Sequence, residues 1–204
     1  TNMITSNPYI GERKAGTVGI VLEDVEIRIA DLEIEDEFKK NGDIGVVEVK
    51  GPNVFKGYWK QPEKTKSEFR DDGYFITGDM GFLDQDKYLT IVGRNKDLII
   101  TGGLNVYPKE IETVIDQDSN VDESAVVGVS HPDFGEGILA IIVEKKGHSI
   151  NVDIINETLR KNLAAFKLPK KIHVIKELPR NSMGKVQKNV LRDIYRDEFS
   201  DTNK

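Results

Sequence analysis

The pattern of apolar residues changes once along the chain, close to Arg94, and this change constrains the fold more than any other feature. Before it, short apolar runs are separated by turn signals such as Asn41-Gly42-Asp43, which indicates a β-rich region. After it, strand-like runs alternate with segments whose apolar residues recur at helical spacing. We therefore predict an α+β protein in two parts, residues 1–95 and 96–204, with the junction at residues 94–97.

The first part is expected to consist mainly of strands. Runs rich in β-branched residues occupy residues 18–22, 25–29, 44–49 and 88–92, and such residues favour strands. Residues 31–40 are first acidic and then basic. This segment is expected to form a solvated hairpin or loop.

The second part is expected to be a β-sheet flanked by helices. Strands are predicted at residues 98–100, 124–129, 138–143 and 172–175. Pro108 is expected at the first position of a helix, and Asn151 is a suitable N-cap for a second helix. A last helix is indicated near residues 190–195, and the charged tail 192–204 is expected to be its solvated end.

The charge and residue content exclude several classes of function. The 204 residues carry a net charge of −6, whereas a protein that binds nucleic acid by general electrostatics is normally basic. The chain has no cysteine, so it can form neither a disulfide nor a thiolate metal site. The histidines at positions 131, 148 and 173 are scattered without the spacing of metal ligands.

No targeting or membrane segment is indicated. No apolar run approaches the roughly 20 residues needed to span a membrane, and the N-terminus lacks the basic region and apolar core of a signal peptide. We therefore expect a cytoplasmic protein. The first residue is not methionine, so the chain is expected to begin within a longer protein.

Two polar residues before the junction could bind a nucleotide. Asp79 follows Thr77-Gly78 at the end of an apolar stretch, and an ionised carboxylate can accept two hydrogen bonds from a ribose diol. The alternative is a turn aspartate that bonds to its own backbone. Arg94 could reach a ribose or phosphate with its forked donors, or it could form a surface ion pair with Asp97 or another neighbouring acid.

Two glycine-containing loops lie beyond the junction. Gly102-Gly103 would let a ligand or another chain approach the backbone, or it is an ordinary tight connection from a strand into the helix at Pro108. It lacks the spacing of a dinucleotide or P-loop fingerprint. The loop that ends in Gly184-Lys185 could swing its lysine into a site and out again. The ammonium suits an anionic phosphate or carboxylate, although most surface lysines are simply solvated.

Taken together, four motifs resemble those of the adenylate-forming superfamily, which includes acyl-CoA synthetases, adenylation domains of peptide synthetases and luciferases. They are Thr77-Gly78-Asp79, residues 93–97 (GRNKD), residues 102–112 (GGLNVYPKEIE) and the loop from Pro179 to Lys185. The resemblance covers essentially the whole chain. It is greatest toward the malonyl-CoA synthetase branch, through residues 48–59, 131–137 and 179–188.

The resemblance implies the C-terminal part of an ATP-dependent acyl-CoA ligase, an acid-thiol ligase. Such an enzyme activates a carboxylate, here malonate or a similar short dicarboxylate, to acyl-AMP and transfers the acyl group to CoA. Residues 1–95 would end the large AMP-binding domain in a β-barrel-like subdomain, and residues 96–204 would form the mobile C-terminal domain. The intact enzyme would use ATP, Mg²⁺ and CoA. The magnesium site and most of the acyl pocket would lie upstream, so this fragment is expected to hold no metal and to be inactive alone.

The same resemblance implies roles for individual residues. Asp79 would bind the ribose hydroxyls, and Arg94 would assist at the ribose or phosphate. Lys185 would contact the α-phosphate and the carboxylate during adenylation, and relatives suggest that a lysine acetyltransferase could act on it. The remaining assignments are a hinge at Lys96 and Asp97, a pantetheine tunnel at Gly102 and Gly103, and the acyl pocket at Met3.

Two other functions stay open at this point. The chain could be part of an amino-acid or aryl-acid adenylation domain that feeds a carrier protein, although no carrier-like sequence follows Lys185. It could also be an inactive module that binds a nucleotide or CoA. Binding of AMP and CoA to the 204 residues would separate this last reading from an enzyme fragment.

Overall fold

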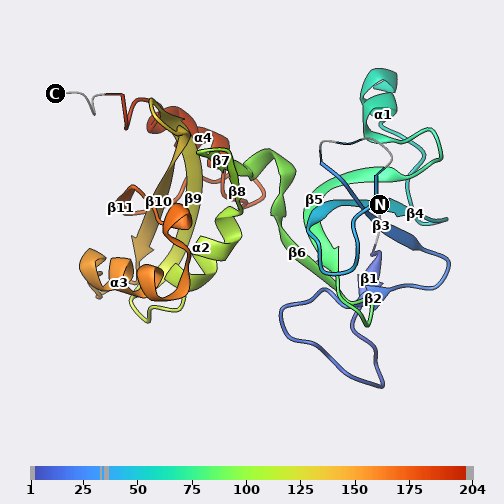
Figure 1. Cartoon of the computed structure of the whole chain (residues 1–204), viewed down its shortest axis with the longest axis horizontal. Helices are drawn as coiled ribbons and strands as arrows, with labels where there is room; N and C mark the ends of the chain where they lie inside the picture. The colour runs from blue at the N-terminus through green and yellow to red at the C-terminus, as the bar shows by residue number, and fades with distance from the viewer. Residues whose placement is uncertain (1–2, 33, 35–36, 201–204) are drawn as a thin grey trace. The chain divides into compact units, whose positions relative to one another are not determined.

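The computed structural model describes residues 3–32, 34 and 37–200 and divides into two compact units, residues 1–96 and 97–204 (Figure 1). Each unit has its own sheet and its own buried core, and each is therefore described by itself. The junction predicted at residues 94–97 comprises the short 3₁₀ helix η1 (Asn95–Asp97) and the residue before it.

Unit 1, residues 1–96, is organised around a four-stranded antiparallel sheet. Its strands are β3 (Glu26–Ala30), β4 (Gly45–Lys50), β5 (Phe75–Leu83) and β6 (Leu89–Arg94), in that order across the sheet. A separate antiparallel pair is formed by β1 (Thr5–Ser6) and β2 (Ile20–Val21). Ile29, Val47, Val49 and Leu89 form the buried cluster of this unit. Three of the four are β-branched, and such residues suit the half-buried face of a pleated sheet.

The sequence pattern predicts unit 1 only in part. The strand expected at residues 44–49 corresponds to β4, whereas the one expected at 18–22 shortens to the two residues of β2. The pattern does not reveal the full length of β5, because Thr77, Gly78 and Asp79 interrupt its apolar alternation. Of the loop expected at residues 31–40, positions 33, 35 and 36 lie outside the described residues.

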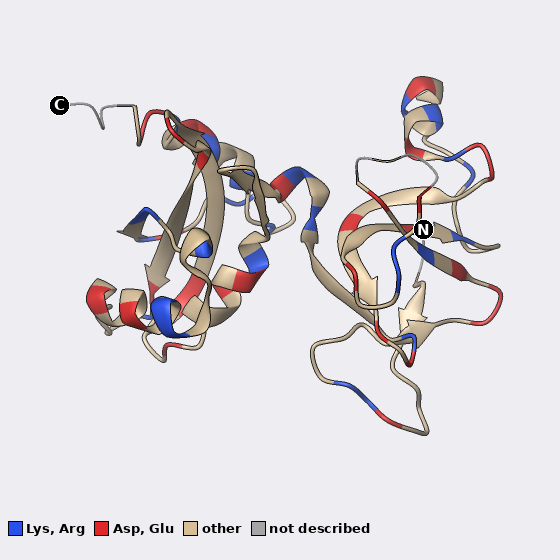
Figure 2. Ribbon diagram, in the orientation of Figure 1, with Lys and Arg blue, Asp and Glu red and all other residues tan. Residues whose placement is uncertain are grey.

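Helix α1 (Pro62–Glu68) is also absent from the sequence prediction. None of its residues is buried, and its surface carries both acidic and basic side chains (Figure 2). A helix without an apolar stripe gives no 3.6-residue periodicity to recognise. Pro62 at its first position is the one local signal for its start.

Unit 2, residues 97–204, contains a five-stranded mixed sheet. Its strands are β7 (Ile99–Thr101), β8 (Leu104–Val106), β9 (Val121–His131), β10 (Gly135–Glu144) and β11 (Lys171–Ile175). The longest ladder joins β9 and β10 in an antiparallel hairpin. It runs from the pair Val121 and Glu144 to the pair His131 and Gly135. β11 pairs in parallel with β10, and β7 pairs with both β10 and β8.

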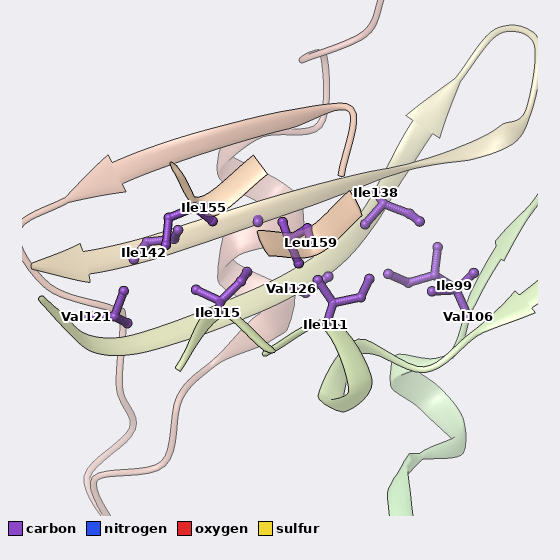
Figure 3. Close-up of a cluster of buried hydrophobic side chains, with 11 residues drawn as sticks. Ile99, Val106, Ile111, Ile115, Val121, Val126, Ile138, Ile142, Ile155 and Leu159 are labelled. Atoms are coloured by element: carbon purple, nitrogen blue, oxygen red, sulfur yellow. The ribbon is translucent and has the colours of Figure 1, made fainter. Parts of the chain in front are cut away.

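Two helices cover one face of this sheet. They are α2 (Pro108–Ile115) and α3 (Val152–Asn162). Figure 3 shows the buried cluster between them and the strands, which includes Ile111, Ile115, Ile142, Ile155 and Leu159. Both predicted helix starts are confirmed. Pro108 opens α2, and the Asn151 side chain accepts hydrogen bonds from the backbone N–H groups of residues 153 (2.9 Å) and 154 (3.4 Å).

The opposite face carries α4 (Lys188–Ile194) and a second buried cluster. Because side chains alternate along a strand, Val126 faces α2 and α3, whereas its neighbours Ala125 and Val127 lie in this second cluster. Leu178 and Leu191 pack there as well.

The prediction of a solvated tail after residue 192 is wrong in one respect. α4 ends at Ile194, and Phe199 is only 3% exposed. Its ring packs beside His131, with ring centroids 5.1 Å apart, and against Gly137, where an added Cβ would meet Phe199 Cε2 at 2.4 Å. Residues 201–204 of the tail lie outside the described residues. In the described ranges, no helix is long and apolar enough to cross a membrane.

Candidate functional site

The two residues predicted to contact the nucleotide, Asp79 and Arg94, lie opposite each other on β5 and β6. Arg94 Nε is 2.9 Å from Asp79 Oδ1, and Arg94 Nη1 donates to the carbonyl oxygen of Thr77 at 3.1 Å. Asp79 lies in the middle of β5, whereas the sequence places it at the end of an apolar stretch. The acid that pairs with Arg94 is Asp79.

The backbone around Asp79 is fixed by the two residues before it. Thr77 Oγ1 donates to the carbonyl oxygen of Val47 (2.8 Å) and accepts from the backbone N–H of Asp79 (3.1 Å). Gly78 has a φ of +73°, in the left-handed region that favours glycine. In the Thr-Gly-Asp motif, the threonine thus anchors the backbone, the glycine permits the left-handed turn, and the aspartate follows in a fixed position.

Burial and the ion pair act in opposite directions on Asp79. Loss of hydration in the fold raises the pKa of the Asp79 carboxyl above its usual range, and the nearby positive charge of Arg94 offsets this in part. The Asp79 side chain is 29% exposed and that of Arg94 is 53% exposed. Both side chains can therefore be reached by a small polar ligand.

The residues predicted as a hinge, Lys96 and Asp97, lie in η1 at the boundary between the two units. Lys96 is exposed. Asp97 is held within unit 2, because its Oδ1 accepts from Arg192 Nη2 of α4 at 2.7 Å. Asp97 is thus part of the packing of α4.

Gly102 and Gly103 form the turn of the β7–β8 hairpin, and both have positive φ, +57° and +78°. The expected connection from a strand directly into a helix is therefore wrong, since β8 lies between the turn and α2. The backbone N–H of Gly102 donates to the carbonyl oxygen of Phe134 at 2.9 Å. A Cβ on Gly103 would have no atom within 4 Å, so this backbone is open on that side.

Lys185 lies on a closed hairpin. Backbone hydrogen bonds join Asn181 N–H to the Lys185 carbonyl oxygen (3.0 Å) and Gln187 N–H to the Pro179 carbonyl oxygen (2.8 Å). Asn181 Oδ1 also accepts from the backbone N–H groups of Met183 and Lys185, both at 3.0 Å. The loop predicted to carry Lys185 is thus a hairpin whose backbone is hydrogen-bonded on both sides of Gly184.

Both ends of this hairpin are attached to unit 2. At its start, Arg180 donates to the Gly184 carbonyl oxygen (2.6 Å) and forms an ion pair with Glu123 of β9. At its end, Lys188 Nζ lies 2.6 Å from Glu112 Oε1 of α2. The Lys185 side chain itself is exposed. The hairpin thus presents an ammonium to solvent from a fixed base.

Met3, predicted to line the acyl pocket, is 61% exposed, and its carbonyl oxygen accepts from Asn53 Nδ2 at 2.8 Å. Thr1 and Asn2, which precede Met3, lie outside the described residues. Among the residues that the structure describes, no group of three or more His, Asp or Glu side chains is arranged to hold a metal ion.

Sequence reasoning misses two residues that shape the site. Asn181 could be found from its place in a turn that contains Gly184. Asparagine side chains in turns often bond to the backbone two residues later, which here is the N–H of Met183. Glu112 is one acid in the buried face of α2, between Ile111 and Ile115. A single acid on an apolar face is the signal that could identify it.

Comparison with known proteins shows which family and which enzymes this chain is similar to. Residues 110–185 match the model of the AMP-binding enzyme C-terminal domain. The chain is 42% identical to a probable CoA ligase, CCL8, of Humulus lupulus and 40% identical to the malonate–CoA ligase of Arabidopsis thaliana; each alignment covers 93% of this chain but 33% and 32% of those relatives. The chain therefore spans about a third of the length of the curated relatives it matches. The crystal structure of ATP-bound MatB from Rhodopseudomonas palustris is 58% identical, with a TM-score of 0.91, over 98% of this chain and 39% of that one.

Proposed function

We propose that this chain, which carries an AMP-binding enzyme C-terminal domain and has CoA ligases as its homologues, supplies the C-terminal part of an ATP-dependent acyl-CoA ligase. The observation that carries the proposal is the similarity to such ligases along nearly the whole chain, both units included. In this proposal residues 1–95 end the large AMP-binding domain, and residues 96–204 are its mobile C-terminal domain.

The reaction has two steps. A carboxylate oxygen of the acid forms a bond to the α-phosphorus of Mg-ATP, and pyrophosphate leaves. The sulfur of CoA then forms a bond to the acyl carbon, its proton is released, and AMP leaves. The first step brings two anions together, so the protein must chiefly neutralise charge and hold the reactants in position.

Lys185 is proposed as the catalytic residue of the first step. Its ammonium is exposed at the tip of a hairpin whose base is fixed, so it can contact the α-phosphate and the acid carboxylate without first ordering its own backbone. A compact positive charge suits this task. Gly102 and Gly103 are proposed to face the pantetheine arm of CoA in the second step, which is supported by the open space beside the Gly103 backbone.

Asp79 and Arg94 are proposed to bind the ribose of the nucleotide. An ionised carboxylate is an acceptor for both hydroxyls of a ribose diol, and Arg94 would keep Asp79 ionised while it donates to the ribose or a phosphate. Lys96 and Asp97 are proposed as the hinge and Met3 as part of the acyl pocket.

The proposed acid is malonate or a similar short dicarboxylate. It is supported by the similarity to the malonate–CoA ligase of Arabidopsis thaliana. A cytoplasmic location belongs to the same proposal, because the substrates ATP and CoA are available there.

The test is made on the full-length protein that carries this chain. We expect malonate-dependent exchange of pyrophosphate into ATP, with methylmalonate used less well and acetate poorly. The 204-residue chain alone is the control and is expected to show no exchange. Exchange that depends on an amino acid or an aryl acid, with no malonate activity, would contradict the proposal.

Acetylation of Lys185 is proposed as a means of regulation. Acetylation removes the positive charge of a lysine, so the adenylation step should stop. The measurement is pyrophosphate exchange by full-length protein with acetyl-lysine incorporated at position 185. Undiminished exchange would refute this regulation.

A further inference from the structure

We propose that Glu112 is a positioning residue for Lys185, acting through Lys188. This inference rests on the proposed function, because it explains what holds the Lys185 ammonium in the position that adenylation would require. It concerns a buried carboxylate that plays no part in the two chemical steps described above. Lys188 lies three residues beyond Lys185.

The position of Glu112 requires an explanation. It lies on the buried face of α2, next to Ile111, and is only 6% exposed. A buried charge is costly unless it is paired and hydrogen-bonded. An apolar residue would satisfy the helix periodicity at this position equally well.

The contacts of Glu112 supply the explanation. Its Oε1 accepts from the backbone N–H of Val126 at 2.9 Å and from Lys188 Nζ at 2.6 Å. β9 is hydrogen-bonded as a strand to β10, so one edge of β9 carries amide groups that need other acceptors. Glu112 binds such an amide and the ammonium with a single oxygen atom.

The pair connects helices on opposite faces of the sheet. Glu112 belongs to α2, which packs with Ile99 and Val126 on one face. Lys188 is the first residue of α4, whose Leu191 packs in the cluster on the other face. The ion pair passes around the edge of β9 and fixes the start of α4 relative to α2.

The apolar packing of the hairpin does not provide this alignment by itself. Leu178 and Leu191, on either side of the hairpin, hold it against the sheet, but hydrophobic contact is non-directional. A hydrogen bond between ionised groups is short and directional. The 2.6 Å contact of Lys188 is the directional contact at the end of the hairpin, as the Arg180–Glu123 ion pair is at its start.

A shift of Lys188 would reach Lys185 through the hairpin ladder. Between them lie Val186, which is bridged to Arg180, and Gln187, whose N–H binds the Pro179 carbonyl oxygen. The backbone between residues 185 and 188 is thus held by hydrogen bonds, so a displacement of Lys188 would also displace Lys185. Glu112 controls the position of the exposed ammonium without touching it.

The test compares three variants of the full-length protein. Glu112→Gln keeps an oxygen acceptor for Val126 N–H but removes the charge, Lys188→Met removes the ammonium, and Lys188→Arg keeps a cation. A displacement of about 1 Å can lower a rate by roughly 100-fold. We expect adenylation, measured by pyrophosphate exchange, to fall about 10- to 100-fold in the first two variants. Lys188→Arg should retain most of the activity.

The second readout separates positioning from general destabilisation. Thioester formation from supplied acyl-AMP does not use Lys185 in the proposed mechanism, so it should stay unchanged in all three variants. Ile115→Val, also on the buried face of α2, is the control, because it weakens packing but leaves the ion pair. It should leave the ratio of the two half-reaction rates unchanged. An equal loss of both half-reactions in Glu112→Gln would overturn the proposal.

A third readout needs no enzyme activity. In the 204-residue chain, amide hydrogen exchange at Met183 and Lys185 should be faster in Glu112→Gln and Lys188→Met than in Ile115→Val. Unchanged exchange at these amides would also overturn the positioning role. If the wild-type full-length protein lacks both half-reactions, the proposed function fails, and hydrogen exchange alone still decides whether Glu112 fixes the hairpin.

Discussion

At the scale of single residues, the Lys185 ammonium is the group on which the proposed chemistry depends most. A positive charge about 4 Å from the transferring phosphate contributes on the order of 4 kcal/mol at an effective dielectric constant of 20. In the full-length protein, Lys185→Ala should therefore lower pyrophosphate exchange roughly a thousandfold. Thioester formation from supplied acyl-AMP should be spared.

Lys185→Arg is the matched control for this prediction, since it keeps the charge but changes the shape of the cation. It should retain more pyrophosphate exchange than Lys185→Ala. An equal loss of both half-reactions in Lys185→Ala would show that the lysine does not belong to adenylation alone.

Asp79 should titrate above the usual carboxyl range in the 204-residue chain, because burial raises its pKa. Its folded pKa lies above its unfolded value, so ionisation of Asp79 lowers the stability of the fold as the pH rises from the unfolded toward the folded pKa. Arg94→Met should raise the Asp79 pKa further, since it removes the opposing charge. The measurement is an NMR titration of the side-chain carboxyl carbons.

Asp72 provides an internal reference for that titration. Hydrogen bonds from Arg28 lower the pKa of Asp72 below the usual aspartate value. Asp72 should therefore titrate below that value and Asp79 above it. An Asp79 midpoint at or below that of Asp72 would contradict the description of the site.

At the scale of elements, the Lys185 hairpin depends on Asn181. Asn181→Ala removes the acceptor for two backbone N–H groups, each hydrogen bond contributing about 0.5–1.5 kcal/mol. We expect the Lys185 amide to exchange faster with solvent in the 204-residue chain, and adenylation in the full-length protein to fall by about 10-fold or more.

Asn181→Asp keeps an oxygen acceptor at the same position and should preserve the protection of the Lys185 amide. A Lys185 amide that exchanges equally fast in Asn181→Ala and wild type would mean that the backbone ladder alone holds the hairpin closed.

At the scale of the whole molecule, the two units have separate cores and should lose stability separately. Leu159 of α3 is fully buried in unit 2, and Leu89 of β6 is 1% exposed in unit 1. Replacing a buried leucine by alanine costs about 2–5 kcal/mol. Leu159→Ala should therefore destabilise residues 97–204, and Leu89→Ala residues 1–96.

Peptide-resolved hydrogen exchange of the 204-residue chain measures both effects in one experiment. In each variant, protection should fall throughout the unit that carries the substitution and persist in the other. A uniform loss of protection in both units would contradict their description as separate cores.

Local sequence signals determined the parts of this protein that follow from chain chemistry alone. Pro108 and Asn151 identify two helix starts, because proline lacks an N–H and asparagine can accept from one. The strands that form the β9–β10 hairpin are recognisable, since runs of buried β-branched residues suit a sheet core. The motifs around Asp79 and Lys185 carry the resemblance to the adenylate-forming superfamily.

The tertiary structure decided everything that depends on residues distant in sequence. It paired Asp79 with Arg94, buried Phe199 in a tail that reads as solvated, and joined Glu112 to Lys188 across 76 positions. Such contacts depend on which strand edges and sheet faces meet, and periodicity along one segment carries no information about that. For the same reason, the sequence identified Lys185 as a candidate, whereas the fold determined what holds it in place.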